Sequence, residues 1–298
     1  MHKAIKHSKI RHFADDTNLL INNSSLKQLK KYLNFDLKQL SNWLIANKIS
    51  LNCSKTEYMI FRHPNKQLNY DLKIKLNGKR LIPSKSVKYL GIVLDPHLNW
   101  SFHVDSLAPK LTRAAGMLSK IRHYVPENTL RSIYFGIFAS LLTYAAQVWA
   151  QFSNKHVSRL QTIQNKAIRI INFGKFRDSV TPLYQKSRIL KLIDHVKVQN
   201  FMYVHNSLKG NLPLALKDSF QTAEEAFAYH TRAPRYQHNM ALPKARTQSY
   251  GFHSIKFCSA TLWNDIVNKL PEEKFQLQSI NVCKKKITEH FIEGYSNP

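Results

Sequence analysis

The chain has 298 residues, of which 43% are hydrophobic and 21% charged, a composition that supports packed cores and excludes a disordered protein. Lys and Arg number 45 against 18 Asp and Glu, and the formal net charge of +27 favours a polyphosphate partner over a basic or neutral one. A basic surface without a ligand, a protein of ribosomal type and a surface that faces a membrane are the alternatives that charge alone leaves open.

The three cysteines lie far apart and lack a Cys-x-x-Cys spacing, so they support neither a zinc site nor a disulfide framework. The first residues also lack the apolar core of a signal peptide. We therefore expect an intracellular protein, nuclear or cytoplasmic, that is not secreted.

The first predicted elements are a hairpin and a helix. Residues 9–13 and 17–21 are strand-like and flank Phe13-Ala14-Asp15-Asp16, which predicts a hairpin with an acidic tip. Ser25 can cap a helix from Leu26 to about Asn47, because leucines recur there at helical spacing.

Short strands are predicted next, at 49–51 and 57–61, around a turn over 52–55. The dipeptide Asn77-Gly78 between alternating runs predicts a type I′ hairpin of residues 72–76 and 79–82. Residues 87–94 then form an apolar run that predicts one strand ending at Asp95-Pro96.

Beyond about Asn99 the spacing of apolar residues becomes helical. This spacing, with Pro126, Pro182 and Pro213 as breaks, predicts helices over 103–123, 127–150, 155–172, 182–208, 252–270 and from about 278. The change of period marks the best domain boundary. The fold class is α+β: a small antiparallel sheet with a helix over 1–98, a helical domain over 99–210 and a basic helical region over 211–298.

One uncharged segment, 132–154, is long enough to span a membrane. On a helical wheel, however, its polar and small residues gather on one narrow arc: Ser132, Gly136, Ser140, Thr143 and Gln147. Such a stripe is typical of a soluble helix, so we predict no membrane partner. A membrane protein anchored by this segment stays as an alternative.

The acidic tip is the sharpest candidate site. Asp15 and Asp16 are adjacent in a chain that is short of acids, and adjacent carboxylates repel unless a cation lies between them. Their hard oxygens suit Mg²⁺ or Mn²⁺, and in two-metal phosphoryl transfer such carboxylates hold the ions. The alternative is an ordinary polar turn, in which Asp is common.

The residues around this pair resemble a known signature. Phe13-Ala14-Asp15-Asp16-Thr17 resembles the palm hairpin of reverse transcriptases, and residues 43–56 are similar to the next palm motif of the non-LTR retrotransposon enzymes. The resemblance implies that Asp15 and Asp16 are catalytic metal ligands. It also makes Lys55 a candidate proton donor to pyrophosphate, against the alternative of a solvated lysine in a turn.

Later segments continue the resemblance to jockey- and CR1-like elements. Residues 87–95 resemble the strand pair that grips the primer terminus, which implies that role for Tyr89, Leu90 and Gly91 and leaves Asp95 to end the strand. Similar matches occur at 144–149, 160–167, 242–247 and 262–264. The implied fold is a truncated reverse-transcriptase palm, 1–98, then a helical thumb, 99–210, and a basic carboxy-terminal region.

Basic residues gather on the predicted helices. In 155–172, Lys155, Arg159, Lys166 and Arg169 share one arc, while Val157, Leu160, Gln164, Ala167 and Ile171 lie broadly opposite. The preceding helices add Lys110, Arg113, Lys120, Arg122 and Arg131. We predict that these nine residues contact the phosphates of an RNA template or RNA–DNA duplex; a solvated charged face is the alternative.

The family palm also needs a third carboxylate on an earlier strand. Only twelve residues precede Phe13 here, and none is acidic. We therefore expect a fragment of an RNA-directed DNA polymerase that binds its divalent ions only if that carboxylate is supplied, that uses no small-molecule cofactor, and that does not polymerise alone. The alternative is a basic protein that binds RNA or RNA–DNA duplex without chemistry.

Overall fold

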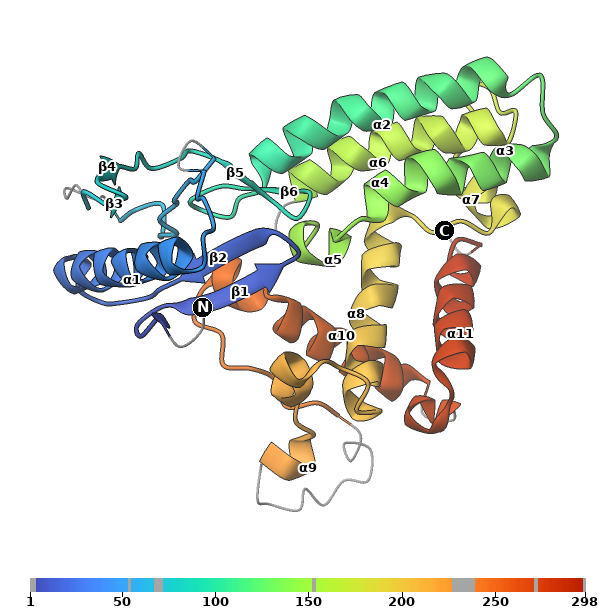
Figure 1. Ribbon diagram of the computed structural model, residues 1–298. Helices are drawn as coiled ribbons and strands as arrows, with labels where there is room; N and C mark the ends of the chain where they lie inside the picture. The colour runs from blue at the N-terminus through green and yellow to red at the C-terminus, as the bar shows by residue number, and fades with distance from the viewer. Residues whose placement is uncertain are drawn as a thin grey trace. The chain divides into compact units, whose positions relative to one another are not determined.

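A computed structural model describes residues 4–52, 55–66, 72–151, 154–226, 239–270 and 273–296 (Figure 1). The chain divides into two compact units, Met1–Leu98 and Asn99–Pro298. The first unit contains the described strands and one long helix, whereas the second is helical. The chain is thus of mixed helix and sheet, as expected for the α+β class, and each unit is described here by itself.

The first unit opens with the predicted acidic hairpin. Strands β1, Lys9–Phe13, and β2, Asp16–Leu20, pair antiparallel, with Phe13 opposite Asp16 and Ile10 opposite Leu19. Ala14 and Asp15 form the two-residue loop, and Ala14 has a left-handed φ of 49°. In the described part of the chain this is a sheet of two strands.

Helix α1, Leu26–Ala46, follows as predicted, and the Ser25 hydroxyl accepts a hydrogen bond from the amide of Gln28 at its start. The predicted leucine stripe faces inward, with Leu37, Leu40 and Leu44 buried and the earlier leucines half-buried. This face packs with residues of the following segment, including Leu72, Ile74, Leu76 and Leu81, to form the core of the unit.

Asp36 of α1 ties the amino-terminal segment to the helix. Its carboxylate accepts hydrogen bonds from the consecutive amides of Lys6, His7 and Ser8 at 2.6–3.3 Å. Burial raises the pKa of Asp36, but the hydrogen bonds from Ser8 and from the Lys6 and His7 amides outweigh it, so the pKa lies below its ordinary value. The residues that lead into β1 are therefore held by one buried anion.

The Asn77-Gly78 hairpin is confirmed, although its strands are short. Strands β3, Lys75–Leu76, and β4, Lys79–Arg80, pair antiparallel. Asn77 and Gly78 have φ values of 48° and 77°, as a type I′ turn requires.

Three predicted strands in this unit differ from the structure. Residues 49–51 and 57–61 form no ladder; Tyr58 makes one isolated bridge with Pro83. Residues 87–94 are not one strand but two, β5, Val87–Tyr89, and β6, Ile92–Leu94, paired antiparallel. The chain reverses at Leu90 and Gly91, whose φ values are 45° and 83°.

In the second unit, α2, Ser101–Ile121, and α6, Asn154–Ile171, lie side by side (Figure 1). Arg159 of α6 pairs with Asp105 near the start of α2, and Phe173, after α6, contacts Arg122 and His123, after α2. Contacts therefore advance in the same direction along both helices, which means that α2 and α6 run parallel.

The predicted helix over 127–150 is interrupted. It consists of α3, Glu127–Ile133, a π-helical stretch, Tyr134–Ala139, α4, Ser140–Thr143, and α5, Ala146–Trp149. The break falls at Tyr144 and at Ala145, which has a left-handed φ of 49°. The indole of Trp149 donates to the carbonyl of Tyr144 at 3.1 Å, which satisfies an acceptor that the break releases.

By length and composition alone, the segment Glu127–Trp149 could cross a membrane. It buries one face inside the unit, formed by Leu130, Tyr134, Phe138 and Leu142. The opposite side carries Ser132, Gly136 and Ser140 of the predicted polar arc, all exposed. This one-sided burial is typical of a helix packed on a soluble core, and the absence of a membrane partner stays a prediction.

The predicted helix over 182–208 is two helices, α7, Thr181–Ser187, and α8, Leu192–Leu208, because Arg188 turns left-handed with a φ of 50°. Gln164 of α6 holds the junction. Its amide group donates to the Leu190 carbonyl and the Tyr134 hydroxyl, and its oxygen accepts from the Leu192 amide. The matched segment 160–167 thus binds the start of α8.

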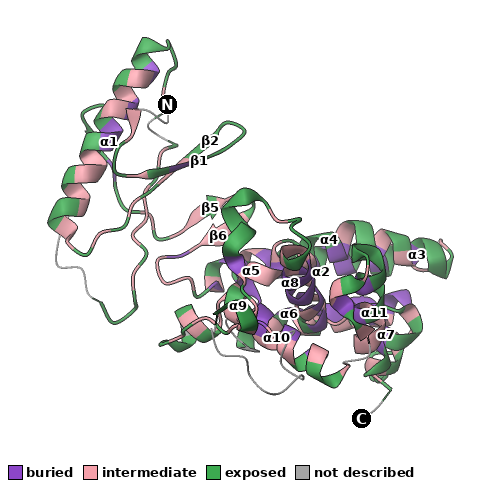
Figure 2. Cartoon of the chain, turned by 90° about the horizontal axis from the view of Figure 1, so that it is seen from below, coloured by how far each residue is buried: buried purple, intermediate pink, exposed green. Residues whose placement is uncertain are grey.

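Helix α8 is enclosed by its neighbours and is mostly purple in Figure 2. It packs against α10, Ile255–Lys269, and α11, Ile280–Glu293, where Trp263 stacks on Phe201 with ring centroids 4.5 Å apart. Both predicted late helices are confirmed with shifted starts. A 3-10 turn, Leu214–Ser219, the short α9, Ala223–Ala226, a π turn, Gln248–Phe252, and a 3-10 turn, Phe275–Leu277, complete the unit.

Candidate nucleic-acid interface and acidic hairpin

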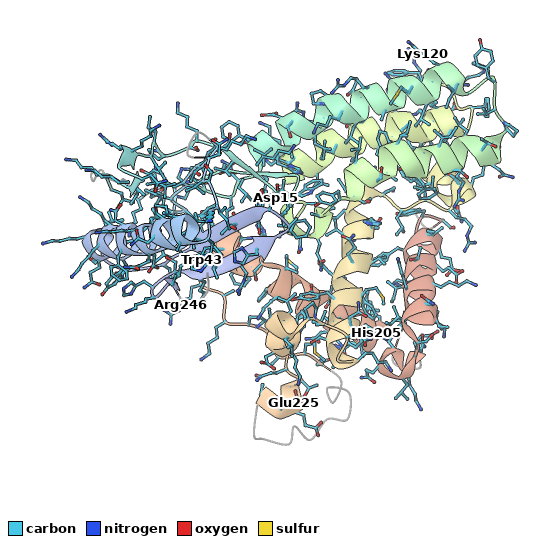
Figure 3. All side chains as sticks on the ribbon, in the orientation of Figure 1. Asp15, Trp43, Lys120, His205, Glu225 and Arg246 are labelled. Atoms are coloured by element: carbon cyan, nitrogen blue, oxygen red, sulfur yellow. The ribbon has the colours of Figure 1, made fainter. Side chains whose placement is uncertain are left out.

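The hairpin of β1 and β2 presents both predicted metal ligands to solvent. Asp15, labelled in Figure 3, is in the loop. Asp16 is the first residue of β2, and both residues are exposed. Among the described residues, neither carboxylate has an ion-pair or hydrogen-bond partner. Two free carboxylates can contribute to the oxygen shell of Mg²⁺ or Mn²⁺.

They fill only part of such a shell. In the described part of the chain, no group of three His, Cys, Asp or Glu side chains is placed to hold a metal ion. Asp36 is occupied by the backbone amides of the amino-terminal segment, so it cannot complete the site without releasing them. The remaining ligands would come from water, nucleotide phosphates or another carboxylate.

The other predicted residues of the first unit lie on turns. Lys55 is exposed, and its amide donates to the Asn52 carbonyl at 3.2 Å, as the predicted turn requires. Cys53 and Ser54 lie outside the described residues. Tyr89 ends β5, and Leu90 and Gly91 form the reversal, so these three predicted primer-grip residues share one hairpin tip.

Asp95 has a local structural role. It is buried, and its carboxylate accepts a hydrogen bond from the His97 amide at 2.9 Å. The His97 ring in turn contacts the carbonyl of Arg62 at 3.0 Å. These contacts fix the turn after β6, which agrees with the expectation that Asp95 only ends the strand.

The basic side chains of α2 and α6 are mostly exposed on the second unit. Lys110, Arg113 and Lys120 project from α2, with Lys120 near its end in Figure 3. Helix α6 has the predicted division: Lys155, Arg159 and Lys166 are exposed and Arg169 is half-buried, whereas Leu160, Gln164, Ala167 and Ile171 are buried. We call the seven basic residues the basic face.

Some predicted phosphate ligands already have partners within the unit. The Arg131 guanidinium donates to the Ser187 carbonyl at 2.9 Å and lies 5.0 Å from the Phe135 ring centroid. Arg122 lies 5.1 Å from the Phe173 ring, and Arg169 donates to the Asp178 carbonyl at 3.0 Å. These three residues organise loops and helix ends, so their side chains are less free than the exposed lysines.

Sequence reasoning missed two features of this surface. Asp105 of α2 pairs with Arg159 across the two helices, and no pattern within either helix predicts that contact. Tyr124, Phe173 and Phe176 are exposed in the loops after α2 and α6. We call residues 122–124 and 173–177 the aromatic tip.

Further aromatic residues of the second unit follow among basic residues, at Tyr229, Tyr236, Tyr250 and Phe252. Tyr250 and Phe252 are partly exposed, and Phe252 packs edge-on against Phe257 at 4.9 Å. Tyr229 and Tyr236 lie outside the described residues. Phe102, near the start of α2, is also exposed, whereas the aromatic tip lies where α2 and α6 end.

Comparison with known proteins identifies relatives of the chain. It is 26% identical over 197 residues to the RNA-directed DNA polymerase from mobile element jockey of Drosophila melanogaster, covering 63% of this chain and 20% of that protein. It is 30% identical over 128 residues to the probable RNA-directed DNA polymerase from transposon X-element of the same species, covering 42% and 14%.

A third relative is the retrovirus-related Pol polyprotein from type-1 retrotransposable element R1 4 of Nasonia vitripennis, 27% identical over 166 residues, which are 50% of this chain and 42% of that protein. The chain thus spans less than half the length of these relatives. No family model and no solved structure matches it. The chain is a homologue of part of the RNA-directed DNA polymerases of jockey- and R1-type non-LTR retrotransposons.

Proposed function

We propose that the chain is a fragment of a reverse transcriptase whose helices α2 and α6 hold the duplex of RNA template and new DNA. In this assignment, residues 1–98 are palm, 99–210 are thumb and 211–298 are a basic carboxy-terminal region. The observation that carries the proposal is the basic face on two parallel helices. Asp105 is the single acid in the sequences of both helices, so pairing within them cannot neutralise this face.

The length of the basic face suits a duplex. Its residues extend from Lys155 to Arg169 on α6, a length of about 20 Å at ~1.5 Å per residue. Double-stranded DNA carries about one charge per 1.7 Å of its axis, so a rod of this length passes many phosphates. Exposed lysines and arginines at successive turns can therefore contact the backbone without reading its sequence.

The test is the salt dependence of binding to a short blunt RNA–DNA duplex, measured by fluorescence anisotropy. Each lost phosphate contact lowers the slope of log affinity against log salt by about 0.9 for a B-form duplex. A variant with Lys110, Arg113 and Lys120 changed to Gln should lose about three such units. Its matched control changes Lys217, Lys256 and Lys269, which are exposed in the same unit but lie outside α2 and α6.

The control should keep nearly the whole slope. Equal losses in both triple variants would mean that binding follows net charge and not the basic face, and an affinity insensitive to salt would reject the proposal.

For the first unit, the proposal gives Asp15 and Asp16 the role of metal ligands, with Lys55 as proton donor and residues 89–91 as primer grip. When bound, two divalent ions activate the primer hydroxyl and stabilise the leaving pyrophosphate. Asp15 and Asp16 supply two carboxylates toward those ions, and a third must be supplied. We therefore expect no robust primer extension by this chain alone.

Titration with Mn²⁺, followed by electron paramagnetic resonance, separates this proposal from a duplex-binding protein without chemistry. Binding that is lost in the Asp15→Asn/Asp16→Asn variant supports a surviving metal site. The Asp105→Asn/Asp178→Asn variant, which also removes two exposed carboxylates, is the control. Equal Mn²⁺ binding in all three proteins would favour the protein without chemistry.

A further inference from the structure

The aromatic tip lies where α2 and α6 both end. Because these helices run parallel, the loops that follow them emerge at the same end of the pair and meet there. The Phe173 ring centroid is 6.2 Å from that of His123 and 5.1 Å from the Arg122 guanidinium. At ~1.5 Å per residue, the tip is about 25 Å along α2 from the Asp105–Arg159 pair.

Two aromatic side chains at the tip are almost fully exposed. Tyr124 is 86% exposed and Phe176 is 89% exposed, whereas Phe173 is 43% exposed beneath Arg122. Large aromatic side chains usually bury most of their surface when they stabilise a fold. Tyr124 and Phe176 contribute little burial here, so their rings are available to a partner.

The loop that carries Phe176 has a defined conformation. The Gly174 amide donates to the Arg169 carbonyl at 2.8 Å, and the Asp178 carboxylate accepts from the Lys175 amide at 2.7 Å. A side chain at position 174 would meet Leu183 and Asp178 at 3.2 and 3.3 Å, which favours glycine there. The rings are thus presented on a folded loop.

The surroundings of these rings are positively charged. Arg122, Lys175 and Arg177 belong to the tip itself, and Lys120 precedes it on α2. The neighbouring acids are engaged: Asp178 binds the Lys175 amide, and Glu127 pairs with Lys186 at 3.0 Å. Exposed rings among cations are suited to bases and their backbone, because stacking needs only the flat face of a base.

We propose that the aromatic tip stacks on unpaired bases that extend from the duplex held by the basic face. This inference rests on the proposed function, because it places the single strand at the end of the same duplex. A protein partner is the less favoured occupant, since Arg122, Lys175 and Arg177 flank the rings in the chain and suit an anionic partner.

The experiment compares a blunt RNA–DNA duplex with the same duplex extended by a few unpaired nucleotides, using the full chain. The extension should raise affinity by about tenfold, the value of roughly one stacked base. The Tyr124→Ala/Phe176→Ala variant should lose this gain and keep its affinity for the blunt duplex. The Tyr124→Phe/Phe176→Tyr variant, which keeps both rings, should retain the gain.

Leu214→Ala is the matched control, because Leu214 is also 89% exposed in the same unit but lies outside the tip. A fluorescent base analogue in the extension should be quenched by the unmodified protein and by the control, and not by the double alanine variant. RNA and DNA extensions, tested separately, show which strand the tip prefers.

The outcomes separate the two proposals. Equal affinity for blunt and extended duplexes overturns the tip assignment and leaves duplex binding intact. Failure to bind the blunt duplex overturns the proposed function and the tip assignment with it. Unquenched bases, together with a protein whose binding needs Tyr124 and Phe176, would assign the tip to that protein.

Discussion

In the first unit, separate two-stranded ladders flank one apolar cluster on α1, whereas in the second unit α8 is enclosed by α6, α10 and α11. An isolated two-stranded hairpin is marginally stable at best, so each ladder depends on its contacts with the rest of the unit. The second unit spreads its stability over many helix contacts. A single substitution in the first unit should therefore destabilise only its surroundings. A single core substitution in the second unit should destabilise the whole unit.

The largest expected effect is in the second unit. Trp263→Ala removes a fully buried ring that stacks on Phe201, and it should lower the free energy of unfolding by about 3–5 kcal/mol. Urea denaturation followed by circular dichroism measures this loss. Trp263→Phe should lose less, and a loss confined to α10 in hydrogen exchange would contradict the picture of one shared core.

A smaller and local effect is expected for Asp36→Asn in the first unit. The variant keeps the shape of the side chain but removes the anion that three amides bind, at a cost of about 1–3 kcal/mol. Hydrogen exchange should accelerate in β1 and β2 more than in α2 or α6. Asp178→Asn, where an exposed carboxylate accepts one loop amide, is the milder control.

Acid should distinguish the two units. Burial lowers the pKa of His205 and outweighs the hydrogen bond from its ring to the Gln278 carbonyl, which raises it. Burial, together with the charge of Lys110, lowers the pKa of His103. The stability that these neutral rings contribute is complete above the ordinary value of 6.5 and is lost as the pH falls below it. The Asp36 contribution is lost only below its ordinary value of 3.8.

The second unit should therefore weaken first as the pH is lowered from neutrality. Unfolding by urea at a series of pH values tests this order, and His205→Gln should flatten the dependence between neutrality and mild acid. If the first unit loses stability at a higher pH than the second unit, the expected order is wrong.

The smallest expected effects have opposite signs in the two units. Gly91→Ala forces a side chain into a φ of 83° at the β5–β6 reversal and should cost about 1 kcal/mol. Gly116→Ala adds a methyl group to open space on α2 and should stabilise it by about 0.5–1 kcal/mol. Thermal unfolding measures the change in stability of both variants. A change of the same sign in both would contradict the prediction.

The helices were easier to predict than the strands because a helix satisfies its hydrogen bonds within one segment. The leucine spacing of α1 and the two faces of α6 were visible in the sequence and are confirmed. The sequence of residues 87–94 is that of a plausible single strand. The strand is divided because Leu90 adopts a left-handed φ, which its side chain does not favour. The resemblance to a strand pair was the better guide there.

The residues of the candidate site also differ in how well the sequence predicts them. Asp15 and Asp16 could be placed at a hairpin because Phe13-Ala14-Asp15-Asp16 is a local pattern. The Asp105–Arg159 pair and the aromatic tip depend on contacts between segments about fifty residues apart, and neither segment alone predicts its partner. Helix breaks at Ala145 and Arg188 were likewise missed, since neither residue is a usual helix breaker.

The parallel course of α2 and α6 has an electrostatic consequence. Antiparallel neighbours cancel their macrodipoles, but parallel neighbours place two negative carboxyl ends together, here beneath the aromatic tip. Lys120 and Arg169 occupy the last turns of these helices, where they offset that negative potential. These two side chains, with Arg122, Lys175 and Arg177 of the tip, thus keep this end of the pair attractive to a nucleic acid despite the two negative helix ends.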